Sequence, residues 1–140
     1  MYTVLVPVKT ERSLAAAEYA AALPESESTV EVVLVSVFEE FEAADEASVV
    51  RSDDLYEETD LPADVLEVAR TLEEHGIDVT VRREHGDPVE EIHRVAAEID
   101  ADTIAMAGRD RSATGKVLFG SVIQGVILES ERPVTVLRRE

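Results

Sequence analysis

The 140-residue chain has no cysteine, no tryptophan and only two lysines, Lys9 and Lys116. Without cysteine it cannot form disulfides, thiolate metal sites, iron–sulfur clusters or a cysteine nucleophile. No apolar run approaches the roughly 20 residues needed to cross a bilayer. Residues 1–7 also lack the basic region and cleavage site of a signal peptide. We therefore expect a cytoplasmic protein with no membrane partner.

Positive charge is scarce as well. The chain has 13 Lys+Arg against 31 Asp+Glu, for a formal net charge of −18. Nucleic acids and anionic membranes bind basic surfaces, so we expect neither as a partner. An acidic, lysine-poor chain suits a salt-rich cytosol, because at 1 M salt the Debye length falls to about 3 Å and screens self-repulsion. We expect a halophilic source; an acidic protein from a mesophile is the alternative.

Hydrophobic residues make up 45 % of the chain, which is enough for one globular domain spanning residues 1–140. Short apolar, β-branched segments alternate with segments whose apolar residues follow helical spacing. Strands are predicted at 3–8, 30–37, 77–83, 102–107 and 133–137. This alternation predicts an α/β fold, with a parallel sheet covered by helices on both faces.

Local signals predict where several helices begin and end. Asp87 and Pro88 are typical of a helix start, as cap and first helical residue. Gly76 is well suited to end the preceding helix. In the last helix, the apolar spacing predicts that Ile127 faces inward. Residues 39–60 hold ten acids and one base, which predicts a long surface connection.

No constellation of side chains indicates catalysis. The histidines His75, His85 and His93 are scattered, and His93 is predicted on the exposed side of its helix, so we expect surface roles and no metal site. There is no G-x-S-x-G elbow and no pair of carboxylates in a defined pocket. The chain is therefore not expected to be an enzyme, or at most a weak ATPase.

The loop from residue 108 to 121 is the main candidate site. Ligands of parallel α/β sheets bind beyond the carboxyl ends of the strands, where successive connections diverge. The first strand ends there near Val8, and a helix begins near Gly120, offering free N–H groups and a positive dipole end. Ser121 is predicted to be the helix N-cap or a phosphate ligand.

Three of the chain's 13 bases also lie in this loop, within a stretch of eight residues: Arg109, Arg111 and Lys116. They favour an anion site, and the alternative is an ordinary turn whose arginines pair with acids elsewhere. The loop is not a Walker A motif, because Val117 follows Gly115-Lys116 where Ser or Thr is required. No G-x-G-x-x-G follows the first strand either.

Taken together, these segments resemble the universal stress protein family over nearly the full length of the chain. The resemblance is carried by Val4 to Val8 with an Ala-rich first helix, Gly86 to Pro88, Ala101-Asp102, Gly108 with Phe119 to Ser121, and Arg132 to Val134. It implies an open five-stranded parallel sheet of order 3-2-1-4-5, similar to Rossmann-like nucleotide-binding folds. With the acidic composition, it points to a halophilic archaeon. It also implies a homodimer through the last strand: Pro133, Val134, Thr135, Val136 and Leu137.

ATP-binding members of that family share a G-x2-G-x9-G-[ST] loop. Gly108 matches its first glycine and Gly120-Ser121 its last pair, but Arg111 takes the place of the middle glycine and the following stretch is one residue short. Lys9 stands where those members have an Asp. The resemblance thus implies a nucleotide site, with ATP and Mg²⁺ as candidate ligands, at Pro7, Val8, Lys9, Val37, Gly108, Arg109, Arg111, Lys116, Gly120, Ser121 and Val122.

Three functions remain open at this point. The loop could bind ATP in the manner of the family, or the bases could grip another phosphorylated ligand directly as charge-assisted donors. In both cases the protein would be a small regulatory module. Alternatively Arg111 could fill the site, and the chain would be a stress or interaction protein that acts through homodimerisation without a small ligand.

Overall fold

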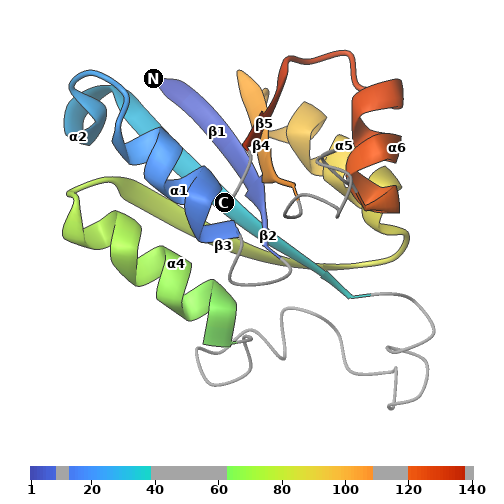
Figure 1. Cartoon of the computed structure of the whole chain (residues 1–140), viewed down its shortest axis with the longest axis horizontal. Coiled ribbons are helices and arrows are strands. Elements are labelled where there is room, and N and C mark those ends of the chain that lie inside the picture. Colours follow the sequence, from blue (N-terminus) through green and yellow to red (C-terminus); the bar gives the residue numbers. More distant parts are fainter. Residues whose placement is uncertain (9–12, 39–62, 109–119, 138–140) are drawn as a thin grey trace, which may run out of the picture.

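The computed structural model describes residues 1–8, 13–38, 63–108 and 120–137. Five parallel strands form one sheet in the order β3-β2-β1-β4-β5, with helices on both sides (Figure 1). The predicted sheet, its strand order and its α/β class are confirmed. None of the helices in these ranges is long and apolar enough to span a bilayer.

The strands lie within a residue or two of their predicted places. Their bounds are β1 Tyr2–Pro7, β2 Val30–Phe38, β3 Asp78–His85, β4 Thr103–Ala107 and β5 Val134–Leu137. The helices are α1 Ser13–Ala21, α2 Ser26–Thr29, α4 Ala63–Glu74, α5 Pro88–Glu98 and α6 Ser121–Glu129. The short helix α2 was not expected. The long acidic connection was predicted at residues that lie outside the described ranges.

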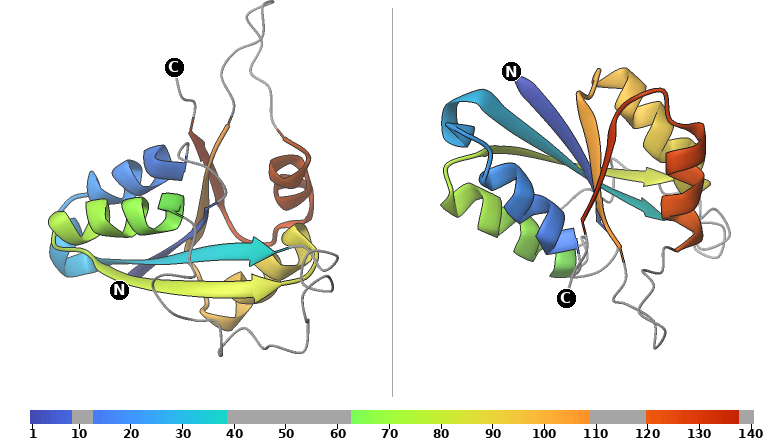
Figure 2. Two further views of the ribbon diagram at one scale, coloured as in Figure 1. Left: turned by 90° about the horizontal axis from the view of Figure 1, so that it is seen from below. Right: turned by 45° about the horizontal axis from the view of Figure 1, so that its top comes forward.

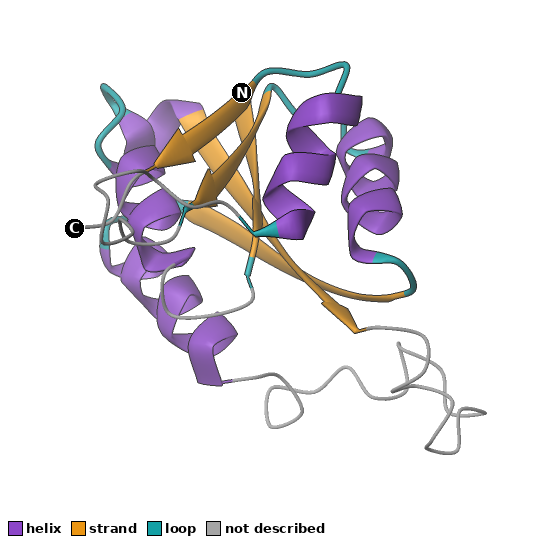
Figure 3. Cartoon of the chain, turned by 45° about the vertical axis from the view of Figure 1, so that its right-hand side comes forward, coloured by secondary structure: helices purple, strands orange, loops and turns teal. Residues whose placement is uncertain are grey.

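Strand β1 divides the core because successive side chains of a strand point to opposite faces. Val4, Val6 and Val8 pack on one face, together with Ala17 of α1 and Leu72 of α4. On the other face Leu5 packs with buried residues of α5 and α6, including Ile92, Val95 and Val126. Figures 2 and 3 show the two pairs of helices on opposite sides of the twisted sheet.

The predicted helix signals are confirmed where the structure describes them. Asp87 is the N-cap of α5, and its Oδ2 accepts a hydrogen bond of 3.1 Å from the backbone N–H of Glu90. Pro88 is the first helical residue, where its missing N–H costs nothing. Gly76 follows α4 with φ of +77°, a backbone conformation that favours glycine.

The prediction for Ile127 is wrong. Its side chain is 42 % exposed, and that of the next residue, Leu128, is 82 % exposed. Among the described residues, Val126 of α6 fills the contact with the sheet and α5. Successive residues of a helix are rotated by about 100° about its axis, so Ile127, one residue after Val126, points away from that contact.

Candidate functional site

The connections of the sheet diverge at the carboxyl ends of β1 and β4, which lie side by side with Val4 opposite Thr103. After β1 the chain passes to α1 on one face, and after β4 it passes to α6 on the other. We call this place the switch point. In open α/β sheets it is the general position for ligands.

The residues that directly follow β1 and β4 at the switch point are held in place by backbone hydrogen bonds. The N–H of Val8 donates to the carbonyl of Val35 at 2.9 Å, and the N–H of Gly108 donates to the carbonyl of Leu137 at 2.7 Å. Val8 is 5 % exposed and belongs to the core. Neither N–H is therefore free to meet a ligand, and among the described residues of the switch point the free backbone donors are those at the start of α6.

Gly120 is the N-cap of α6 and lies in extended backbone, with φ of −70° and ψ of 164°. Any residue can adopt this conformation, so the backbone does not require glycine here. A Cβ atom at Gly120 would also meet nothing within 4 Å. Neither strain nor packing among the described residues requires glycine here; glycine is a favoured N-cap residue, and it leaves open space at the first N–H groups of the helix.

The charge around the start of α6 favours an anion. The first turns of α6 and α1 hold no acidic residue, whereas α4 has Asp64 there and α5 has Glu90 and Glu91. The first N–H groups of a helix lack partners within it, and the aligned peptide dipoles give that end a partial positive charge. Although the chain has 31 acidic residues, none of them lies in the first turn of α6 to offset this partial positive charge.

Of the remaining predicted site residues, the structure describes four: Pro7, Val37, Ser121 and Val122. Pro7 ends β1, while Val37 and Val122 are partly buried against the α5–α6 side of the core. Ser121 is exposed and is the first residue of α6, so the prediction that it is the N-cap is wrong; that position belongs to Gly120. Outside the described residues lie Lys9, Arg109, Arg111 and Lys116.

Sequence reasoning missed a cluster at the carboxyl ends of β2 and β3. The guanidinium carbon of Arg83 lies 4.2 Å from the centre of the Phe38 ring, which is a cation–π contact. The ring of His85 lies 5.7 Å from that of Phe38. Phe38 and His85 stand opposite each other in the strand register, so only the pairing of β2 with β3 could have revealed the contact.

A network of ion pairs fixes α5 against the edge strand β3. Arg94 of α5 lies 2.8 Å from Glu84 of β3 and 2.6 Å from Glu91, and Arg82 bridges Glu84 and Glu98. Partial burial lowers the pKa of Arg82, but its hydrogen bonds to Glu98 and Glu84 outweigh this and raise it. The hydrogen bond from Arg82 lowers the pKa of Glu98. The network is structural and lies on the face that carries α6.

The prediction that His93 lies on the exposed side of its helix is wrong. It is partly buried and lines a cavity between α5 and the connection from α6 to β5. The helical pattern marked it as outward because the covering segment lies more than 35 residues further along the chain. His75 is exposed as predicted, and its Nδ1 is 2.8 Å from the carbonyl of Thr71.

Comparison with known proteins gives consistent matches. The model of the Universal stress protein family matches residues 1–138. The Stress response protein NhaX of Bacillus subtilis is 34 % identical over 74 residues, which are 53 % of this chain and 45 % of that protein. Universal stress protein MJ0577 of Methanocaldococcus jannaschii is 33 % identical over 73 residues, 52 % and 45 % of the two chains. The alignments thus span about half the length of these curated relatives.

Solved structures agree with the fold over nearly the whole chain. The structure of MJ0577 superposes with a TM-score of 0.75 at 28 % identity, covering 99 % of this chain and 96 % of that one. A universal stress protein from Archaeoglobus fulgidus, solved in complex with dAMP, superposes with a TM-score of 0.66 at 21 % identity, covering 97 % and 96 %.

Proposed function

This chain belongs to the universal stress protein family, and we propose that it is a regulatory module that binds an adenine nucleotide at the switch point, with the phosphates at the start of α6. The observation that carries the proposal is Gly120. It is an N-cap glycine whose missing side chain leaves open space, among the described residues, where the free N–H groups of the helix begin.

Three further features support an anionic ligand at this place. The first turn of α6 has no carboxylate, and the exposed hydroxyl of Ser121 lies beside the same N–H groups. The chain places Arg109, Arg111 and Lys116 in the segment that leads to α6. A related fold has been solved with dAMP, but at 21 % identity that likeness shows the fold, so the ligand is argued from this chain's own residues.

The proposed ligand is ATP, or another phosphorylated compound held in a different pose. The lysine and arginine that stand at family motif positions, Lys9 and Arg111, would add charge-assisted hydrogen bonds to phosphate oxygens. Mg²⁺ usually reaches such sites through substrate phosphates and one or two protein oxygens. Among the described residues, no three His, Asp or Glu side chains are grouped to hold a metal. We therefore expect Mg²⁺ to bind only with the nucleotide.

The test is titration calorimetry with ATP and with AMP on the wild type and on Gly120→Val. Valine tolerates the extended backbone at this position, and its Cβ has open space, so the variant should fold; because valine is a poorer N-cap than glycine, its melting temperature should fall by only a few degrees. We expect its affinity for nucleotide to fall at least tenfold, a loss of about 1.4 kcal/mol. Unchanged affinity in the folded variant would refute the site.

A ligand-independent role through homodimerisation is the second candidate. The edge strand β5, Val134–Leu137, pairs with β4 on one side only among the described strands, and all four of its residues are partly exposed. Pairing of two such edges would satisfy their free backbone groups. Sedimentation analysis of Val136→Pro tests the dimer, because the hydrogen bonds of Pro133 and Leu137 to β4 place the N–H of Val136 on the side away from β4, and proline removes that donor from the edge.

We further propose that the protein works in concentrated salt in the cytoplasm of a halophile. Its net charge of −18 over 140 residues makes the compact state self-repelling at low ionic strength. Unfolding midpoints measured across a KCl series should rise into the molar range. Maximal stability at low salt would contradict this.

A further inference from the structure

The helix α6 and the edge strand β5 are unusually poor in charge for this chain. Residues 121–128 of α6 and 134–137 of β5 contain no charged side chain, although 31 % of the chain is charged. The strand at the opposite edge of the sheet, β3, carries four charged side chains: Asp78, Arg82, Arg83 and Glu84. Because charged side chains on an edge strand discourage pairing with another chain, β5 is the edge suited to pair.

The direction of the α6 side chains follows from their contacts. A Cβ on Gly125 would meet Val89 of α5, and Val126 is buried between α6 and the sheet. Successive helical residues are rotated by about 100°, so Ile127 lies about 200° from Gly125 and points away from α5. Helix α5 packs against β2 and β3, whereas α6 joins β4 to β5. The side of α6 to which Ile127 points is therefore the side of the β5 edge.

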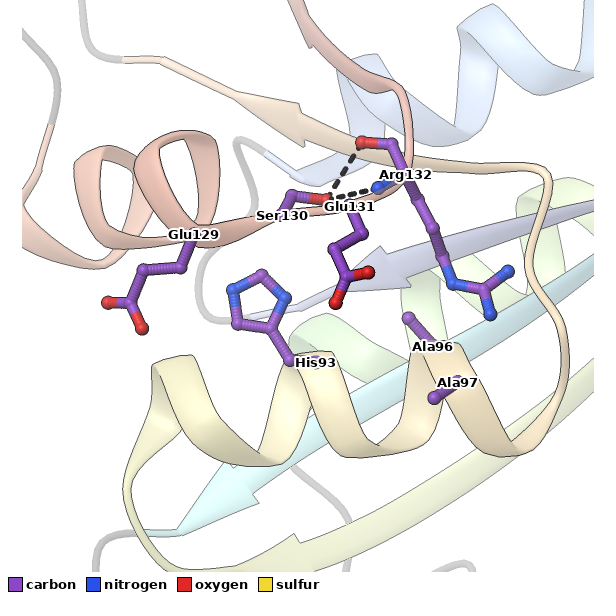
Figure 4. A pocket seen from close by; sticks show the side chains of 7 residues that line it. All are labelled: His93, Ala96, Ala97, Glu129, Ser130, Glu131 and Arg132. Carbon is purple, nitrogen blue, oxygen red and sulfur yellow. Dashed lines mark hydrogen bonds between the residues drawn. The ribbon is translucent and has the colours of Figure 1, made fainter.

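Hydrogen bonds fix the connection between α6 and β5. The hydroxyl of Ser130 donates to the carbonyl of Arg132 at 2.8 Å and accepts from its N–H at 3.0 Å (Figure 4). The Nη1 of Arg132 donates to Oδ1 of Asp100 at 3.1 Å and to the carbonyl of Ala101 at 2.7 Å. These bonds tie the connection to the turn between α5 and β4. A chain that pairs with β5 would therefore meet α6 in a set position.

Strand β5 directs the backbone groups of Val134 and Val136 away from β4. The carbonyls of Pro133 and Leu137 accept hydrogen bonds from the β4 side, and alternate residues of a strand present these groups to opposite sides. Antiparallel pairing of two β5 strands about a two-fold axis at Thr135 would join Val134 of one copy to Val136 of the other. Such a pair makes about four backbone hydrogen bonds.

This strand alone is too small to hold two copies together. A stable interface buries about 800 Å² on each partner, with about 20–30 residues a side, whereas β5 has four residues. The remaining area has to come from elements beside the edge. Val134 belongs to the same apolar cluster as α6, and alternation places the side chain of Val136 on that face too. Ile127, which is 42 % exposed, extends this apolar surface.

We propose that α6 docks on a second copy of this chain, with Ile127 of both copies buried beside the two-fold axis. This rests on the dimer given above as the second candidate function, and it adds the helix that completes the interface. Neighbouring strands are about 4.8 Å apart, so two helices that each cover β4 and β5 come within about 10 Å of each other, a normal packing distance. Each copy carries a net charge of −18, and a charge-free face is where two such copies can meet.

The test is the dimer dissociation constant, measured by sedimentation equilibrium in molar KCl. Ile127→Glu should weaken the dimer at least a hundredfold, because it buries two like charges at the axis. Ile127→Ala should weaken it about tenfold, because apolar surface is lost from both copies. Leu128→Glu is the matched control: it adds the same charge at the next residue, which is 82 % exposed and points away from the sheet, and it should leave the constant unchanged. Circular dichroism verifies that each variant is folded, and Ile127→Ala decides if Ile127→Glu is not.

Val136→Pro separates this inference from the dimer itself. If Val136→Pro breaks the dimer while both Ile127 variants leave it intact, the dimer through β5 stands and the role of α6 is overturned. Equal weakening by Leu128→Glu would mean general charge repulsion and would also overturn it. A wild-type protein that stays monomeric in molar KCl would contradict both the dimer and this inference. No nucleotide is present in these measurements, so they leave the proposed nucleotide site to its own test.

Discussion

Gly125 sets the distance between α5 and α6, and its replacement by alanine tests how the two helices pack. A Cβ built on Gly125 would lie 2.8 Å from Cγ2 of Val89. Carbon atoms in good contact are about 3.5–4.0 Å apart, so the methyl group is too close by about 0.7 Å or more. Val89 is β-branched and has little rotamer freedom in α5. The clash therefore has to be relieved by moving one of the helices.

Overpacking of this kind costs about 1–3 kcal/mol. Replacing a glycine within a helix by alanine returns up to about 1 kcal/mol of helix propensity. Gly125→Ala should thus destabilise the protein by about 1 kcal/mol. Because the chain has no tryptophan, unfolding is best followed by circular dichroism in urea, at a KCl concentration that keeps the wild type folded.

The control is the same substitution in a Val89→Ala background, where the clashing methyl groups are gone. There Gly125→Ala should become stabilising, by up to about 1 kcal/mol, as expected from helix propensity alone. The double-mutant cycle should give a coupling energy of about 1–2 kcal/mol between the two positions. If Gly125→Ala stabilises both backgrounds equally, the two helices do not meet at Gly125 and the reasoning is refuted.

Three further predictions follow from other contacts. Asp87→Ala removes the cap of α5 and should lower the free energy of unfolding by about 1 kcal/mol, whereas Asp87→Ser, which keeps a capping oxygen, should not. Gly76→Ala should cost about 1–2 kcal/mol in the same urea assay although its Cβ has ordinary space, because φ is +77°; no loss would show that the turn relaxes. The lowered pKa of Glu98 means that its ion pair stabilises the protein above its usual pKa of 4.5 and is lost as the pH falls through the lowered value. The stability advantage of the wild type over Glu98→Gln should therefore shrink in acid, and an advantage that grows below pH 4.5 would contradict the assignment.

The sheet was predictable because its signals are local. The β-branched run of β1 predicts a strand buried on both faces, and the cap at Asp87 and the turn at Gly76 fix helix ends within a few residues. Alternation of strands and helices then predicts a parallel sheet. Periodicity does not specify which strands are neighbours, so the strand order could be predicted only from the family resemblance.

The errors arose where the outcome depends on distant segments. The burial of His93 depends on a covering segment that lies more than 35 residues away, and Ile127 is exposed because it points away from the contact of α6 with α5 and the sheet. The cluster of Arg83 and Phe38 depends on strand register, which no motif encodes. At the switch point, sequence reasoning predicted Gly120 as a site residue, and the open space beside it could be seen only in the structure.

Binding of an adenine nucleotide at the switch point is central to the proposed function. The most direct measurement is the nucleotide content of the salt-stabilised protein after equilibrium dialysis against ATP or AMP, released by denaturation and identified by chromatography and mass spectrometry. With no tryptophan and three tyrosines, the chain absorbs little at 280 nm, so a bound adenine is also visible in the absorbance ratio. We predict one nucleotide per wild-type chain and none in Gly120→Val. A wild-type protein that remains empty at millimolar nucleotide would contradict the proposed function.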